Sequence, residues 1–238
     1  MMNRLVLLVV VMALVAPGLL AQDADHHEHQ DHHAQAENRP GHAGVDHSFA
    51  DVERWTRVFD DPERAEWQKP EEVVAALGLE PGSVVADVGA GTGYFLAALV
   101  GAVAPGGKVF AIDTEIEMVR YLRKRADEEK LPGVHAIRCE YDDARIPEGI
   151  ADRILLVDTY HHIHDRPDYL RRLKPSLTPG GQVVVIDFLK KDLPVGPPAE
   201  HKMSRDAVIK EFEEAGYRLA AEERFLPYQY FLRFAPTS

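Results

Sequence analysis

The feature that most constrains the fold is an alternation of short apolar runs with longer amphipathic segments between residues 83 and 188. The runs that predict buried strands are SVVADV (83–88), KVFAID (108–113), VHAIRC (134–139), DRILLVD (152–158) and GGQVVVIDF (180–188). The helices predicted between them are YFLAALVGAV (94–103), EIEMVRYLRKRADEEK (115–130) and RPDYLRRLKPSL (166–177). Strands that alternate with helices form a parallel sheet covered on both faces. We therefore expect an α/β domain with a doubly wound sheet and a ligand site at the carboxyl ends of its strands.

The flanking segments complete one domain, which we place at residues 49–238. Residues 49–79 predict helical pieces that are broken at Pro62 and Pro70. SRDAVIKEFEEAG (204–216) predicts a helix capped by Ser204 and closed by Gly216. YRLAAEERF and YQYFLRF predict a terminal hairpin around Pro227. No repeat and no second domain is expected.

The first 21 residues read as a targeting segment. One arginine precedes an apolar run from Leu5 to Leu20, and the small residue Ala21 follows. This is the layout of a secretory signal peptide, and the run is short for a membrane-spanning helix. Leu19 stands where cleavage sites prefer a small residue, so an uncleaved N-terminal anchor is the alternative. We expect an exported protein, periplasmic or secreted, or one anchored at the membrane.

Residues 22–48 form a segment rich in histidine and aspartate. Seven of the twelve histidines lie between His26 and His47, separated by acids and glutamines, and apolar periodicity is lacking. We therefore expect a disordered linker. Crowded neutral imidazoles can bind divalent metals weakly, and a linker that only tolerates histidine is the other interpretation.

Composition narrows the functional classes. The net charge of −12 argues against a nucleic-acid partner, which would require a basic face. Cys139 is the only cysteine, so the chain has no internal disulfide and no cysteine-based zinc site. We predict no metal centre in the domain.

A glycine-rich turn follows the first predicted strand. Asp87 ends this strand, and Gly89, Ala90, Gly91, Thr92 and Gly93 lead into the next helix. A dinucleotide fingerprint, G-x-G-x-x-G, would place its third glycine at Tyr94, and a P-loop would require a lysine that the turn lacks. Both phosphate-binding interpretations are weakened, and a nicotinamide-dependent oxidoreductase remains the alternative enzyme.

The pattern D-x-G-x-G-x-G resembles the first motif of the class I S-adenosylmethionine-dependent methyltransferases. The resemblance extends from roughly Trp67 to Phe234 and includes LLVDTYHHIHD and LKPSLTPGGQVVVIDF. The most similar branch acts on small molecules, including quinone precursors, and often carries a His-His pair after the fourth strand. The resemblance implies a Rossmann-like sheet of seven strands, mostly parallel with an antiparallel last strand. It also implies methyl transfer from S-adenosyl-L-methionine to a small-molecule acceptor, by in-line displacement at the sulfonium methyl.

The resemblance also implies which residues hold the cofactor, beginning with the glycine turn of Gly89, Ala90, Gly91, Thr92 and Gly93. Asp113, beside Thr114, would accept the ribose hydroxyls, and Asp142 would lie near the adenine amine, with Asp143 able to replace it. Asp158 would complete a set of acids that begins with Asp87. The cofactor carries a cationic sulfonium and an amino group and lacks a phosphate, which suits a site rich in carboxylates. We expect these acids to converge in one crevice.

Candidate groups for the transfer step lie in DTYHHIHD. His161 and His162 are candidates for a general base or for orienting the acceptor, and Tyr160 could contribute its hydroxyl. A pocket-shaping role without proton transfer is the alternative. Metal binding by His161, His162 and His164 is disfavoured, because three close imidazoles on a turn seldom point the same way.

Aromatic residues outside these motifs have two interpretations. Trp55, Phe59 and Trp67 could line the acceptor pocket or pack on the sheet, and the same holds for Tyr228 and Tyr230. An arsenite acceptor is disfavoured, because arsenic requires several cysteines. A third functional class is an exported, non-catalytic binding protein with a metal-binding histidine tail. It is considered because the cofactor is made in the cytoplasm, whereas the N-terminal segment predicts export.

Overall fold

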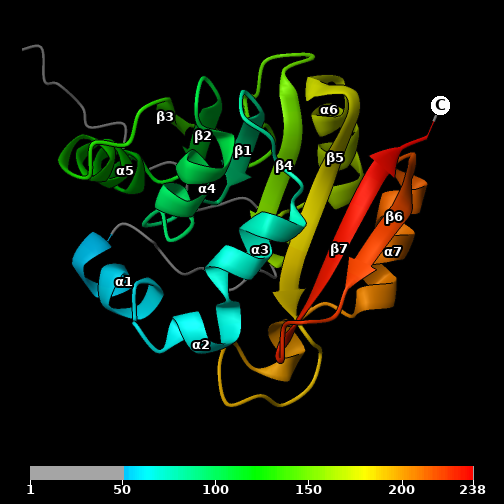
Figure 1. The fold of residues 1–238 in the computed structure, drawn as a ribbon. Helices are drawn as coiled ribbons and strands as arrows, with labels where there is room; N and C mark the ends of the chain where they lie inside the picture. Colours follow the sequence, from blue (N-terminus) through cyan, green and yellow to red (C-terminus); the bar gives the residue numbers. More distant parts are fainter. Residues whose placement is uncertain (1–50, 238) are drawn as a thin grey trace, which may run out of the picture. The chain divides into compact units, whose positions relative to one another are not determined.

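The computed structural model describes residues 51–237, which form a seven-stranded sheet in the order β3-β2-β1-β4-β5-β7-β6 (Figure 1). The segments 1–21 and 22–48 lie outside the described residues. The strands are β1 (Val84–Val88), β2 (Lys108–Asp113), β3 (Val134–Arg138), β4 (Ala151–Val157), β5 (Leu177–Phe188), β6 (Tyr217–Glu223) and β7 (Gln229–Pro236). The first five are parallel, whereas β7 runs antiparallel to β5 and to β6. The predicted mostly parallel sheet with an antiparallel last strand is confirmed.

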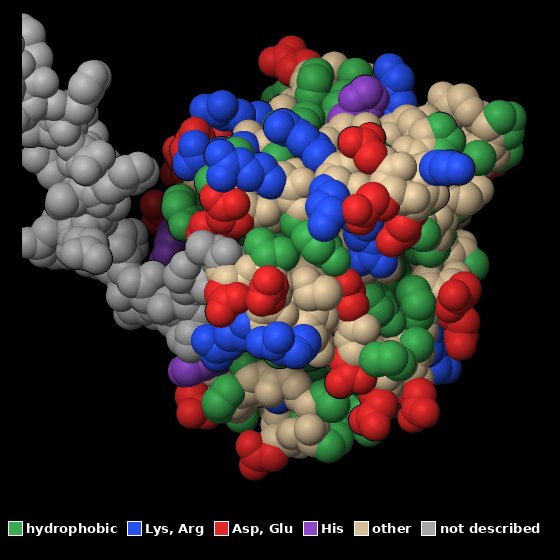
Figure 2. All heavy atoms as spheres, turned by 90° about the vertical axis from the view of Figure 1, so that its left-hand side faces the viewer, with side chains coloured by type: hydrophobic (Ala, Val, Ile, Leu, Met, Phe, Trp, Pro, Cys, Tyr) green, Lys and Arg blue, Asp and Glu red, His purple; other side chains and the backbone are tan. Residues whose placement is uncertain are grey.

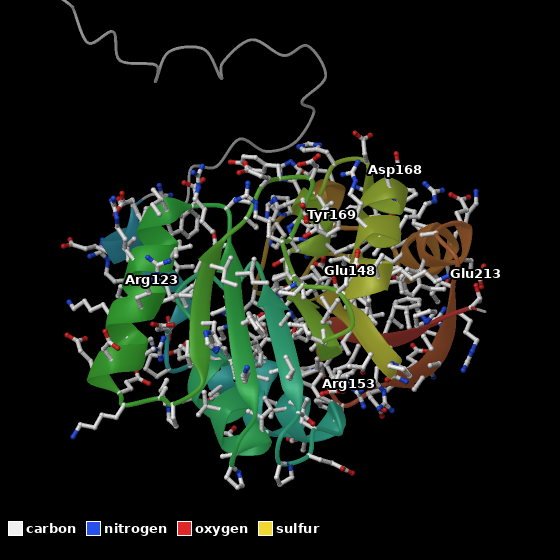
Figure 3. All side chains as sticks on the ribbon, turned by 90° about the horizontal axis from the view of Figure 1, so that it is seen from above. Arg123, Glu148, Arg153, Asp168, Tyr169 and Glu213 are labelled. Atoms are coloured by element: carbon white, nitrogen blue, oxygen red, sulfur yellow. The ribbon has the colours of Figure 1, made fainter. Side chains whose placement is uncertain are left out.

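Two layers of helices cover the sheet, because successive strand residues point to opposite faces. Ile154 and Leu156 of β4 join one apolar cluster with α6 (Arg166–Leu173) and α7 (Arg205–Glu214), and Leu155 joins the other. The second cluster includes α3 (Pro70–Ala76), α4 (Leu96–Val103) and α5 (Ile116–Glu128). Figure 3 shows both layers, with Tyr169 of α6 on one side of the sheet and Arg153, which donates to the Leu77 carbonyl oxygen, on the other.

Local sequence sets the ends of these elements. Ser204 caps α7 by accepting a hydrogen bond from the Ala207 amide at 3.3 Å, as predicted. The chain also breaks as predicted around Pro62 and Pro70, between α1 (Val52–Phe59), α2 (Arg64–Gln68) and α3. Short 3₁₀ turns follow at η2 (Tyr160–His162), η3 (Lys174–Ser176) and η4 (Ala199–His201). The helix predicted over 166–177 ends early, at Leu173, where the turn containing Pro175 replaces it.

The leading helices occupy the functional end of the sheet. Figure 1 shows α1 and α2 beyond the carboxyl ends of the central strands, below them in that view. On the surface formed by α5, ion pairs join Arg120 to Glu117 and Arg125 to Glu129. Figure 2 shows basic and acidic side chains interspersed over this face. Within residues 51–237, no helix has the length and apolar character needed to cross a bilayer.

We predict that Phe212→Ala destabilises the domain by about 3–5 kcal/mol, because it leaves a cavity in the core. Phe212 is fully buried, and its ring centroid lies 3.7 Å from that of Phe234 and 5.5 Å from that of Tyr160. Urea denaturation should show this loss, whereas Val58→Ala, at a side chain that is 53% exposed, should change stability by less than about 0.5 kcal/mol. Equal effects of the two substitutions would contradict the packing described.

Candidate active site

Four carboxyl groups gather at the carboxyl edge of the parallel strands. Asp87 and Asp113 come from β1 and β2, Asp158 directly follows β4, and Asp187 is the second-last residue of β5. Asp87, Asp113 and Asp187 are buried, and Asp158 is partly buried. The parallel topology thus brings together acids that lie up to a hundred residues apart in the chain.

Burial makes three of these carboxyl groups hold their protons unusually well, because it also raises the pKa of Asp113 against the opposing effect of its backbone hydrogen bonds. It raises the pKa of Asp87 to about 7, with a further contribution from Asp113 and an opposing one from Arg64. It likewise raises the pKa of Asp158 to about 7, with Asp187 adding to the shift and Arg64 opposing it. A cationic ligand placed here would favour the ionised form of both groups.

The glycine turn is held by its own amides. The amides of Gly89 and Ala90 donate to the Ile112 carbonyl oxygen at 2.8 and 3.0 Å, and the Gly93 amide donates to the Ala90 carbonyl oxygen at 2.8 Å. A Cβ at Gly89, where φ is +76°, would lie 2.3 Å from Oγ1 of Thr159. Because these amides are used within the protein, the turn differs from an anion cradle, whose amides point at phosphate.

Asp113 fixes the other side of this turn. Its Oδ2 accepts a hydrogen bond from the Gly91 amide at 2.9 Å, and its Oδ1 accepts one from the Glu115 amide at 2.9 Å. Each carboxylate oxygen has a second lone pair, so both oxygens can still accept a ribose hydroxyl. The neighbouring Thr114 is half-buried. The side chain of Thr92 is directed to Asp60 and not to Asp113, because its hydroxyl donates to Asp60 Oδ1 at 2.7 Å, at the end of α1.

Asp142 and Asp143 do not join the buried acids, which corrects the expectation of one crevice for all of them. The side chain of Asp142 is 73% exposed and lies 3.3 Å from Nη1 of Arg172. Asp143 is exposed, and its Oδ1 accepts a hydrogen bond from the Arg145 amide at 2.8 Å. The physical reason is a tight turn, closed by reciprocal backbone hydrogen bonds between Glu140 and Asp143, that directs both side chains outward.

His161 contacts a buried carboxylate, Asp187, which was not predicted as a site residue. Its Nδ1 lies 2.8 Å from Oδ2 of Asp187, which is 0% exposed, and the other oxygen of Asp187 accepts the Phe188 amide at 2.8 Å. Burial lowers the pKa of His161, but the hydrogen bond and the charges of Asp187 and Asp158 outweigh it and raise this pKa above its ordinary value of 6.5. With Nδ1 directed at a carboxylate, Nε2 is the atom that can accept a proton.

Tyr160 and His162 are placed differently. Tyr160 is fully buried, and its hydroxyl donates to Glu211 Oε2 at 2.7 Å, which also accepts from Arg166 at 2.7 Å. The hydroxyl that we expected to aid the transfer is therefore directed to α7, and we assign Tyr160 to packing. His162 is exposed, with its ring centroid 4.1 Å from that of His161. Among the described residues no cluster of three metal-ligating side chains is found.

The leading helices close over this edge. The ring of Trp67 lies 5.6 Å from that of Phe188 and 6.4 Å from that of Tyr228. Phe59 stacks on Trp55 with 5.0 Å between the ring centroids. Phe59 also lies against Gly91, because a Cβ added at Gly91 would be 3.5 Å from the Phe59 ring. The aromatic residues singled out in the sequence thus pack on the sheet and its glycine turn. Both of their proposed roles are compatible with this position.

Polar side chains tie α2 to the edge. Gln68 Nε2 donates to Gln229 Oε1 at 2.8 Å, and Gln229 Nε2 donates to Asp158 Oδ1 at 2.7 Å. Arg64 donates to Gln68 Oε1 at 3.1 Å and lies 3.7 Å from Asp158. Arg64, Gln68 and Gln229 were not predicted as site residues from the sequence. Asp187 could have been found, because it is the second-last residue of a predicted strand, as Asp87 is, whereas the other three residues carry no such signal.

Comparison with known proteins places this site in a family. A model described as "Methyltransferase domain" matches residues 85–181. The crystal structure of an S-adenosylmethionine-dependent methyltransferase from Aquifex aeolicus is 30% identical, with a TM-score of 0.73, over 79% of this chain and 98% of that one. The chain belongs to the S-adenosylmethionine-dependent methyltransferases. Nothing in these comparisons supports a nicotinamide-dependent oxidoreductase.

Curated methyltransferases match over shorter stretches. Phosphoethanolamine N-methyltransferase 1 of Zea mays is 29% identical over 66% of this chain and 30% of its own length. A ubiquinone/menaquinone biosynthesis C-methyltransferase of Ectopseudomonas mendocina is 26% identical over 50% of this chain and 46% of its own length. The chain therefore spans less than half the length of these two relatives.

The residues at the edge fit the cofactor of this methyltransferase family. Asp113 is presented for hydroxyl groups, and the raised pKa values of Asp87 and Asp158 mark carboxyl groups that a bound cation would stabilise in ionised form. Phosphate recognition is not required by a cofactor with a sulfonium and an amino group. When bound, S-adenosylmethionine supplies an activated methyl group.

We predict that the affinity for S-adenosylmethionine rises as the pH is raised through about 7. Asp87 and Asp158 have pKa values of about 7, so below that pH they are protonated and attract a sulfonium less strongly. Calorimetric titration between pH 5.5 and 8.5 measures this, and Asp87→Asn should flatten the profile. The demethylated product lacks the sulfonium charge and should show a weaker pH dependence. Identical profiles for both ligands would contradict the role of these carboxylates.

Proposed function

We propose that this protein transfers the methyl group of S-adenosylmethionine to a small-molecule acceptor whose attacking group must lose a proton, such as a hydroxyl, an amine or an acidic carbon. The observation that carries the proposal is the contact between His161 and the fully buried Asp187. A nucleophile that was already free of its proton would need no oriented base. The relatives named above include an N- and a C-methyltransferase, which supports a small acceptor without choosing its atom.

In this proposal His161 acts as the general base and Asp187 as its positioning residue. Asp187 holds Nδ1, so Nε2 takes the proton of the acceptor as the acceptor attacks the methyl carbon. The carbon–sulfur bond breaks with its electron pair remaining on sulfur, which releases the demethylated product. Alignment of the nucleophile with the methyl group provides most of the acceleration, and the aromatic contact between Trp67 and Phe188 helps to exclude water.

Tyr230 supports an acceptor site at the same place. It pairs with Asp187 across the β5–β7 ladder, and its hydroxyl is buried without a hydrogen-bond partner among the described residues. Buried hydroxyl groups ordinarily have a partner, so we propose that the acceptor provides it. Tyr230→Phe should then raise KM for the acceptor more than it lowers kcat.

We predict that His161→Asn and Asp187→Asn each lower kcat by about 10²–10⁴-fold while the dissociation constant of the cofactor stays within about threefold. Turnover is measured as release of the demethylated product with a panel of phenol, amine and quinol acceptors. For the wild type, kcat should rise with pH through a value above 6.5, and a slower but active Asp187→Asn should shift that inflection downward.

The control is His135→Gln, at an exposed histidine of β3 that stacks on Phe110, which should leave kcat unchanged. If His161→Asn turned over at the wild-type rate, the proposed base would be refuted. If the cofactor bound but no acceptor was methylated, the non-catalytic binding protein would be favoured instead.

We also propose that residues 1–21 direct export or anchor the protein at the membrane, and that the histidines of residues 22–48 bind divalent metals weakly. The proposal is supported by the apolar run after Arg4 and by the seven crowded histidines. N-terminal sequencing of the protein purified from its native host should begin at or near Gln22 if the signal is cleaved. A cytoplasmic protein that begins at Met1 would contradict export.

A further inference from the structure

Arg64 places a guanidinium among the acids of the carboxyl edge. It belongs to α2, its side chain is 13% exposed, and its Nη2 lies 3.7 Å from Asp158 Oδ2. Its guanidinium carbon lies 4.2 Å from the centroid of the Tyr94 ring, next to the glycine turn. Asp158, Asp60 and Asp87 all act on it electrostatically. A cation from the leading helices thus lies between the end of β1 and the end of β4.

The charges at this point match the polar end of the family's cofactor with opposite signs. The methionine end of S-adenosylmethionine carries a sulfonium, an ammonium and a carboxylate. The protein offers two carboxyl groups, Asp87 and Asp158, and one guanidinium, Arg64. We propose that Arg64 binds the α-carboxylate of S-adenosylmethionine and that this contact fixes α2 over the site. The inference rests on the cofactor and is independent of the acceptor chemistry.

The guanidinium keeps donors for such a ligand. Its Nε and Nη2 donate to Gln68 Oε1 at 3.3 and 3.1 Å, and its Nη1 donates to the Phe59 carbonyl oxygen at 3.0 Å. Within residues 51–237 these bonds use three of the five N–H groups, which leaves one on each terminal nitrogen. Two such groups can bind a carboxylate in a bidentate manner.

Arg125, which also reaches the glycine turn, is less suited to this role. It lies 3.1 Å from Asp60 and 2.8 Å from Glu129, and it donates to the Thr92 carbonyl oxygen at 2.9 Å. Its charge is therefore matched by two close carboxylates. Arg64 lies farther from its partner Asp158, at 3.7 Å, and burial lowers the pKa of Arg64, so a ligand carboxylate would stabilise its charge.

Binding at Arg64 would act on the acceptor side as well. Gln68 lies one helical turn further along α2 and joins Arg64 to Gln229 and Asp158. Trp67, whose ring centroid is 5.8 Å from the Arg64 guanidinium carbon, packs on Phe188 beside Asp187. A carboxylate held by Arg64 would therefore hold in place the helix that carries Trp67 toward the proposed base.

The test compares two ligands that differ only in the carboxylate. The wild type should bind S-adenosylhomocysteine about 10- to 100-fold more tightly than its decarboxylated analogue, which keeps the amine. In Arg64→Gln the affinity for S-adenosylhomocysteine should fall by that factor, while the affinity for the analogue should change by less than about threefold. Arg64→Lys, which keeps the charge without the planar fork, should give an intermediate loss. Calorimetric titration measures all of these constants.

The matched control is Arg57→Gln, at an exposed arginine of α1, which should leave both affinities unchanged. Retained binding of the analogue by Arg64→Gln shows that the site is folded. Equal losses for both ligands would overturn the inference, since Arg64 would then serve only the packing of α2. A wild type that does not discriminate between the ligands would also overturn it. Failure of the wild type to bind either ligand would refute the cofactor assignment itself.

Discussion

The burial of several carboxyl groups at one edge of a parallel sheet is the constraint on which the rest of the site depends. An isolated buried carboxylate is costly, so each must be protonated, hydrogen-bonded or paired with a cation. Asp113 is stabilised by two backbone amides, and Asp187 by an amide and His161. Burial nevertheless raises the pKa of Asp113, and it raises the pKa of Asp87 and that of Asp158 to about 7, so the compensation at this edge is incomplete.

This incomplete compensation explains why the leading helices belong to the site. Arg64 is carried by α2, and the chain of amides from Gln68 to Gln229 joins the same helix to Asp158. The buried polar groups of α2 are satisfied at the carboxyl edge, so displacing this helix would leave donors and acceptors unpaired. The acids therefore bind α2 as well as providing charges for a ligand.

The sequence predicted the fold well, because burial in a parallel sheet imposes continuous apolar runs such as Val183 to Ile186. It predicted Asp87, Asp113 and Asp158 correctly as strand-end acids that meet in space. The same rule failed at Asp142, because a local turn directs that side chain outward, a feature that spacing alone does not show. Arg64 and Gln229 could not have been predicted, because their role comes from contacts between segments about 70 to 160 residues apart.

The two halves of the carboxyl edge differ in how strictly they constrain the ligand that binds. On the side of β1 and β2, backbone amides and Asp113 form a frame in which Gly89 and Gly93 admit no Cβ without movement of Thr159 or Leu122. At the ends of β4, β5 and β7, the proposed site is formed by side chains instead. They are His161, Asp187, Tyr230 and the aromatic pair of Trp67 and Phe188. Side chains can be exchanged without disturbing a backbone frame. A fold built in this way can keep one cofactor while its acceptor changes, so we expect those side chains, and not the glycine turn, to select the acceptor of this protein.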